Sequence, residues 1–130
     1  MSTVKVDTLV ASDGTSPVTL TKQSAAKAWA EIAAGGSSLP DSFNFSSIDD
    51  DGSGEYGLNY VSTMSSTNYS ANMTITYNHA GTNNTRNCVI ESKTASSVEV
   101  DSGYIQGSTT YFTAYDIETN ANVTVHGDLA

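Results

Sequence analysis

Short segments in which apolar and polar residues alternate recur along this chain, and this pattern constrains the fold more than any other feature. Successive side chains of a β-strand point to opposite faces of a sheet, so a two-residue period predicts strands with one buried face. From residue 41 onward these segments follow one another with turn residues between them. The apolar positions are Phe43, Phe45, Tyr56, Leu58, Tyr60, Met73, Ile75, Tyr77, Cys88, Ile90, Val98, Val100, Phe112, Ala114, Val123 and Val125. The sequence therefore predicts an all-β fold, an antiparallel β-sandwich of the jelly-roll-like kind.

The first of these segments form a predicted hairpin with an acidic tip. Phe43 and Phe45 are expected on one face of the first strand, and the tip runs from Asp49 to Gly54. Aspartate and glycine favour turns, because aspartate bonds its own backbone and glycine adopts left-handed conformations. The alternative for Asp49–Asp51 is a calcium site. The spacing favours the turn, since an EF-hand register leaves Leu58 where a bidentate glutamate is needed.

Residues 24–34 are compatible with two structures. Ser24 is a suitable helix cap, and the alanines that follow favour a helix. The order apolar, polar, apolar at Ala30-Glu31-Ile32 is instead typical of a strand. A helix of about ten residues is unstable without tertiary support, so these residues by themselves leave both structures open.

The opening of the chain is predicted to be an arm, residues 1–35, that precedes a sandwich domain, residues 36–130. Two short alternating segments flank the turn at Asp13-Gly14, and a two-stranded piece of this size is marginal in water. The Gly- and Ser-rich stretch at 35–40 marks the predicted boundary. The arm is therefore expected to gain stability from other subunits. Its expected assembly residues are Val4, Val6, Leu9, Val18, Leu20 and Trp29.

Charge and composition exclude several classes of partner. Fourteen acidic residues outnumber five basic ones, which gives a net charge of −9. Nucleic acids and anionic membranes are recognised by clustered lysine and arginine, so neither is an expected partner. No apolar run is long enough for membrane insertion, and residues 1–22 do not resemble a secretion signal. The single cysteine, Cys88, predicts a chain made in a cytoplasm without internal disulfides.

No catalytic or metal-binding motif stands out. His79 and His126 are the only histidines, and neither lies in a zinc-protease or nucleophile-elbow pattern. Cys88 alternates with Ile90 and is expected to be a small buried residue. We therefore expect no enzyme activity, no cofactor and no metal, and a small hydrolase is the alternative to this expectation.

One polar loop is a candidate surface for recognition. Residues 78–87 lack apolar anchors and contain Arg86, the only arginine of the chain. Asparagine and arginine donate hydrogen bonds to sugar hydroxyls, and loops on a rigid sandwich often carry binding function. The alternative is a plain connecting loop. The residues expected to contact a ligand are Asn83, Asn84, Thr85 and Arg86.

Several motifs together resemble a module found in structural proteins of marine tailed bacteriophages, which are often described as tail fibres. The likeness spans most of the chain. Its motifs are Lys5-Val6-Asp7-Thr8-Leu9, Gln23-Ser-Ala-Ala-Lys-Ala-Trp29, Asp41-Ser-Phe-Asn-Phe-Ser-Ser-Ile48, Asp51-Gly-Ser-Gly-Glu-Tyr56, Asn68-Tyr69 and His126-Gly-Asp-Leu-Ala130. The stretch Ser24–Trp29 and the Ser-Ser-Ile…Gly-x-Gly-x-Tyr pattern are the most specific. In the family the segment after Lys-Ala-Trp has the pattern of a strand, and Ala30-Glu31-Ile32 keeps its apolar, polar, apolar order, so the resemblance implies a strand over Lys27–Ile32.

The resemblance implies a non-enzymatic virion component, expected as a homotrimer and made in the bacterial host cytoplasm. Its expected partners are further copies of itself, other proteins of the tail or capsid, and a glycan of the host surface. Two other functions stay open at this point. One is a capsid-decorating protein that stabilises the head, and the other is a free carbohydrate-binding module.

Overall fold

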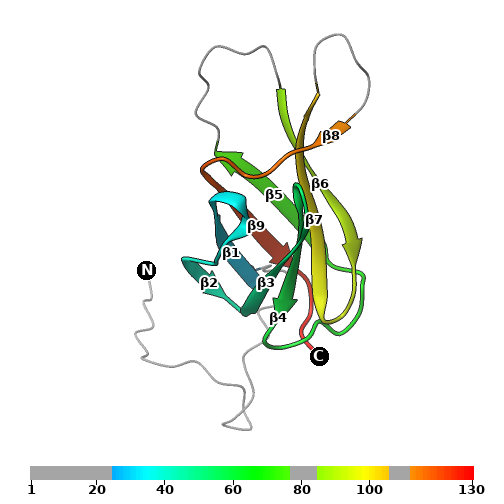
Figure 1. Ribbon diagram of the computed structural model, residues 1–130. Helices are drawn as coiled ribbons and strands as arrows, with labels where there is room; N and C mark the ends of the chain where they lie inside the picture. Colours follow the sequence, from blue (N-terminus) through cyan, green and yellow to red (C-terminus); the bar gives the residue numbers. More distant parts are fainter. Residues whose placement is uncertain (1–24, 77–84, 106–111) are drawn as a thin grey trace, which may run out of the picture.

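The fold is all-β in the computed structural model, which describes residues 25–76, 85–105 and 112–130 (Figure 1). Two antiparallel sheets lie against each other, which confirms the predicted all-β, antiparallel architecture. The only helical segment among the described residues is a single 3-10 turn, η1 (Ala34–Gly36).

The strand bounds follow the predicted alternation. The first sheet has the order β2-β1-β9-β5, and its strands are β1 (Ala28–Ala33), β2 (Asp41–Phe43), β5 (Ser70–Thr76) and β9 (Asn120–His126). The second sheet has the order β3-β4-β7-β6, and its strands are β3 (Phe45–Gly52), β4 (Glu55–Tyr60), β6 (Thr85–Lys93) and β7 (Ser97–Ile105). A short strand, β8 (Phe112–Ala114), pairs with the last residues of β7.

The core lies between the two sheets and consists of the residues that alternate inward. Ile32, Val123 and Val125 line it from the first sheet, and Leu58 and Val98 from the second. Each such aliphatic side chain contributes about 1.5–3 kcal/mol to folding when it is fully buried. The burial of these residues explains why valine, leucine and tyrosine occupy every second position of their strands.

The strand predicted at Lys27–Ile32 is confirmed, but its place in the fold corrects the predicted domain boundary. β1 pairs with β9 over six residues and buries Ala28, Ala30 and Ile32. The glycines after it are packed as well, because the ring of Tyr56 lies against Gly36 and the amide of Gly35 donates to the carbonyl of Ile117. The folded domain therefore includes residues 28–35, which the sequence pattern predicts to be part of the arm.

The chain changes sheets at Asn44, and this corrects the predicted facing of two phenylalanines. Asn44 has a φ of 60°, a conformation that asparagine tolerates better than most residues. Its side-chain amide donates to the carbonyls of Lys27 and Ser62, and its oxygen accepts from the amide of Ser62. As a result Phe45 is buried in the core, whereas Phe43 is 52% exposed on the outer face of the other sheet.

The acidic hairpin is confirmed, with a tighter turn than predicted. Asp49 and Asp50 lie within β3 and pair with Gly57 and Tyr56 of β4. The turn itself comprises Ser53 and Gly54. The three aspartates are therefore strand residues, and those that point outward lie on the exposed face of the second sheet.

Candidate functional site

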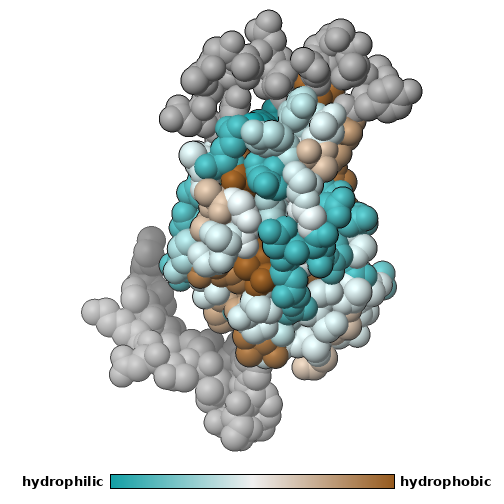
Figure 2. All heavy atoms as spheres, in the orientation of Figure 1, coloured by the Kyte–Doolittle hydropathy of each residue, from teal (hydrophilic) through white to brown (hydrophobic). Residues whose placement is uncertain are grey.

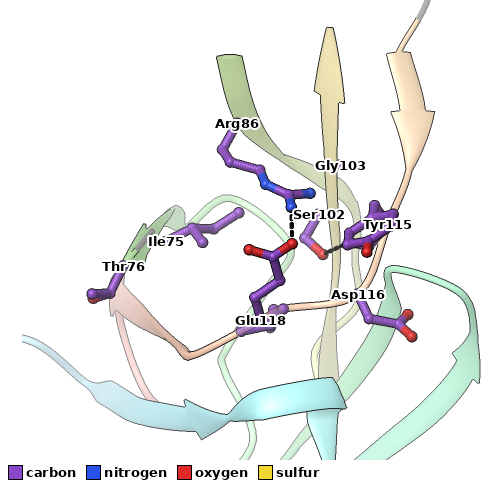
Figure 3. Close-up of a pocket in the computed structure, with 9 residues that line it drawn as sticks. Ile75, Thr76, Arg86, Ser102, Gly103, Tyr115, Asp116 and Glu118 are labelled. Atoms are coloured by element: carbon purple, nitrogen blue, oxygen red, sulfur yellow. Dashed lines mark hydrogen bonds and ion pairs between the residues drawn. The ribbon is translucent and has the colours of Figure 1, made fainter. Parts of the chain in front are cut away.

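A shallow depression lies at the end of the second sheet that carries β8 (Figure 3). Strands β5, β6 and β7 and the segment that joins β8 to β9 contribute to it. Its lining residues are Ile75, Thr76, Arg86, Ser102, Gly103, Tyr115, Asp116, Ile117 and Glu118. Ser102 fixes the joining segment, because its hydroxyl donates to the carbonyl of Tyr115 at 2.6 Å and its own carbonyl accepts from the Tyr115 amide at 2.9 Å.

Arg86 is the central residue of this depression. Its guanidinium donates to the carboxylate of Glu118, and it lies over the ring of Tyr115 at 4.4 Å from the centroid and near that of Tyr104 at 5.8 Å. The Arg86 side chain is only 14% exposed. A charge that is this buried needs a partner, and the carboxylate and the aromatic faces supply one. Arg86 therefore joins β6 to the segment before β9.

Replacing Arg86 by alanine is expected to destabilise the fold by about 2 kcal/mol, because Glu118 loses its partner and the tyrosine rings lose their contact. Arg86→Lys should recover only part of this loss, since an ammonium cannot both stack on Tyr115 and form the same directed bond. Urea unfolding of the three proteins measures the difference. Equal stability of the alanine variant and the unmodified chain would show that the contacts of Arg86 with Glu118 and Tyr115 do not stabilise the fold.

The predicted recognition residues are placed only in part. Asn83 and Asn84 lie outside the described residues, as does the histidine at position 79. Thr85 begins β6, and Arg86 is held by Glu118 rather than presented to solvent. Of the predicted assembly residues, Val4, Val6, Leu9, Val18 and Leu20 also lie outside the described part. Trp29 lies in β1.

Six carboxylates gather on the outer face of the second sheet, a surface that we call the acidic face. Its residues are Asp49, Asp51, Glu55, Glu91, Glu99 and Asp101. Figure 2 shows hydrophilic residues, coloured teal, over the region where Figure 1 draws β4 and β7. Gly57 at the centre leaves space for this crowding, since a side chain there would meet carboxylate oxygens of Glu99 at 3.0 Å and of Asp51 at 3.2 Å. From the sequence only the run Asp49–Asp51 was singled out.

The electrostatics of the acidic face favour protonation. Burial raises the pKa of Glu99, and the neighbouring carboxylates of Asp51 and Glu91 raise it further. Burial also raises the pKa of Asp101, with additional contributions from Glu91 and Glu55. Like charges held close together disfavour the ionised form of each group, so the folded protein binds protons more tightly here than the unfolded chain does.

The stability of the protein should therefore fall as the pH rises from about 4 toward 7, as far as these two groups are concerned. The contribution of a group with a raised pKa is complete below its unfolded value and is lost as the pH passes through the folded value. Glu99→Gln should make the protein more stable at pH 7 by about 0.5 kcal/mol, the scale of a partly exposed charge contact, and should flatten the pH profile.

Asp128→Asn is the matched control for this measurement. It removes the same charge from an exposed position outside the acidic face, so it tests whether the flattening depends on that face. Thermal unfolding between pH 4 and pH 7 at low salt measures all three proteins. A Glu99→Gln variant that is less stable at pH 7 would contradict the repulsion described here.

The outer face of the first sheet has a different character. Phe43, Trp29, Thr124 and Asn72 lie directly opposite one another on four adjacent strands, and we call this line the aromatic row. Trp29 is 37% exposed and Phe43 is 52% exposed. The next line across the sheet is Asp41, Glu31, Asn122 and Thr74. Two aromatic side chains thus lie next to hydroxyl, amide and carboxylate groups on this face.

Among the described residues, no group of three or more His, Cys, Asp and Glu is arranged to hold a metal ion. Cys88 is partly buried, its thiol donates to the Met73 carbonyl at 3.0 Å, and burial raises its pKa. His126 lies at the end of β9. In the described segments no helix has the length and apolar character needed to cross a membrane.

Comparison of the chain with models of known protein families, with curated proteins and with solved structures found no match in any of the three.

Proposed function

We propose that this chain is a non-enzymatic structural protein of a tailed-bacteriophage virion, a fibre- or spike-type appendage that works as a homotrimer. The observation that carries the proposal is the likeness of several separate motifs, in one chain, to phage tail-fibre proteins. These motifs include Ser24–Trp29, Asp51–Tyr56 and the last residues from His126 to Ala130. Under this proposal the two sheets form a jelly-roll-like sandwich that faces outward from the particle and contacts the host surface.

The arm of this proposed appendage is the segment before β1. Residues 1–24 carry the apolar positions Val4, Val6, Leu9, Val18 and Leu20, and Lys5 and Lys22 balance Asp7 and Asp13 in charge. A neutral segment with alternating apolar residues is suited to docking on other virion proteins. The described domain, by contrast, contains most of the acidic residues and would project from the particle.

Related roles share parts of this support. A capsid-decorating protein that stabilises the head would have the same arm and domain. A free carbohydrate-binding module is favoured by the aromatic row, because exposed aromatic faces next to amide and hydroxyl groups are suited to neutral sugars. Such a module would act as a monomer and would not need residues 1–22.

Deletion of residues 1–22 tests the proposal. We expect the full chain, expressed with a tag in infected host cells, to co-purify with particles on a density gradient, and the shortened chain to stay in the soluble fraction. The shortened chain should give the circular dichroism spectrum of a folded β-protein, since it keeps every strand that the structure describes, from β1 onward. Equal incorporation of both forms would overturn the assignment of the arm.

A further inference from the structure

We propose that copies of this chain associate through the outer face of the sheet β2-β1-β9-β5, with the aromatic row at the centre of the contact. This inference rests on the proposed function, which requires a self-associating chain, and it names the surface that does so. The occupant of the face is a second copy of the same chain. In a threefold assembly the residues at the axis meet their counterparts from the other two copies, and the flanks of the face contact a different part of the neighbouring copy.

The first support is the exposure of large aromatic side chains at the edge of this sheet. Trp29 and Phe43 lie opposite each other on β1 and β2, so both side chains project from the same face of the sheet at neighbouring positions. Aromatic residues are enriched in the buried centres of protein interfaces and supply most of the binding energy there. Covering this pair removes more apolar surface than covering any polar position of the same sheet.

The second support is charge. A chain with a net charge of −9 repels its own copies, so contact is favoured only where few charges face each other. The acidic face of the second sheet would bring carboxylates together. On the first sheet the carboxylates near the aromatic row are Glu31 and Asp41, one line away, and Glu31 accepts a hydrogen bond from Asn120 at 2.8 Å. Fewer carboxylates therefore face a second copy here than on the acidic face.

A second exposed apolar set does not compete with this surface. Val89, Ile105 and Phe112 belong to the second sheet, and Val89 lies directly opposite Asp101. Two copies that met through these residues would bury the carboxylates of the acidic face in an interface that excludes water, where unpaired charge is costly. The aromatic row has Thr124 and Asn72 as neighbours instead. Hydroxyl and amide groups both donate and accept hydrogen bonds, so this face can pair with its own copy.

The third support is where the remaining chain joins the domain. The 24 residues before Ala25 connect to the domain four positions from Trp29. When residues 1–24 of several copies are anchored at one place on a particle, the faces that bear Trp29 are brought to high local concentration. Even a moderate contact is then occupied, because linked binding is favoured by effective concentration.

Trp29 is the only tryptophan, so its fluorescence reports on this face directly. We expect the emission of the full chain to shift to shorter wavelength, and quenching by acrylamide to decrease, as the protein concentration rises from nanomolar to micromolar. Sedimentation equilibrium over the same range should show the mass increase in parallel. An oligomer that forms while the Trp29 emission stays constant would place the contact elsewhere and overturn the inference, yet leave the proposed virion function standing.

Phe43→Ser tests the contact without removing the probe. We expect it to weaken self-association by about 10- to 30-fold, the effect of losing an aromatic residue at an interface centre. Val89→Ser, which removes an exposed apolar side chain from the other sheet, should leave the association unchanged. Equal weakening by both variants would contradict a contact centred on the aromatic row, and circular dichroism checks that each variant is folded.

A neutral glycan is the other occupant that the test can reveal. A full chain that stays monomeric at all concentrations, while oligosaccharides quench Trp29, would overturn self-association through this face in favour of sugar binding. Absence of the chain from purified particles, with self-association intact, would instead contradict the proposed virion function and leave the interface in place.

Discussion

Gly54→Ala should lower the free energy of unfolding by about 3 kcal/mol, one of the two largest losses that we expect from a single substitution. Gly54 has a φ of 77°, which costs an alanine about 1–2 kcal/mol. A methyl group there would also lie 2.7 Å from the amide nitrogen of Tyr115, and closer still to the carbonyl oxygen of Ser102. The turn would have to move away from β7, and the bond from its amide to Asp116 at 2.7 Å would be lost.

Gly35→Ala is the matched control, because it separates backbone strain from crowding. Gly35 has a similar φ of 62°, but an added methyl group would meet no atom within 4 Å. Its expected cost is therefore the backbone part alone, about 1–2 kcal/mol. Urea unfolding of both variants measures the difference. Similar losses would show that the turn at Gly54 can shift freely, and that its close contact with β7 and Tyr115 does not hold the fold.

Tyr56→Asp is the other substitution with a large expected effect, about 4–5 kcal/mol. Tyr56 is only 1% exposed, its ring packs on Gly36, and its hydroxyl accepts from the Ile117 amide at 3.2 Å. Aspartate would bury an unpaired charge and leave a cavity in place of the ring. A loss of this size removes most of the stability of a domain at the low end of the usual range, about 5 kcal/mol, so the variant should melt at a much lower temperature.

Tyr56→Phe keeps the ring and removes only the hydroxyl, so it should cost about 1 kcal/mol. Circular dichroism melting curves distinguish the two variants. A Tyr56→Asp protein that melts like Tyr56→Phe would remove this residue from the core and with it the packing of η1 on β4.

The alternation of apolar residues was sufficient to predict the fold class. Val98 and Val100, or Val123 and Val125, are separated by single polar residues, and this period has no competing helical reading. The strand at Ala28–Ala33 was harder, because alanine favours helices. Pairing with β9 selects the strand over the helix there, because it buries Ala28, Ala30 and Ile32 against the opposite sheet.

The change of sheet at Asn44 was not predictable from the period. Phe43 and Phe45 keep the two-residue spacing across it, so the pattern reads as one strand, whereas the positive φ of Asn44 turns the chain and exposes Phe43. Only the tolerance of asparagine for this conformation was a signal, and it is weak. The packing of Gly35 and Gly36 within the domain was not predictable for a related reason. Gly-Gly favours a flexible linker, but the ring of Tyr56 requires the space that glycine leaves.

The candidate surfaces were predictable only as separate residues. Trp29 was selected for assembly from the sequence, but its partner Phe43 was expected in the core. Arg86 was selected for recognition, and the contact with Glu118 depends on residues 32 positions apart in the chain. The acidic face could have been partly foreseen, because Glu99 and Asp101 alternate with buried valines. Its density depends on the pairing of β3, β4 and β7, which the sequence does not specify.

The proposed role is tested most directly by a cryo-electron-microscopy reconstruction of the particles that carry this chain. We predict that the domain of residues 28–130 appears in groups of three around a threefold axis, with Trp29 and Phe43 of each copy turned toward the other two. Particles that lack the chain, or that carry isolated single copies with this face open to solvent, would contradict the account.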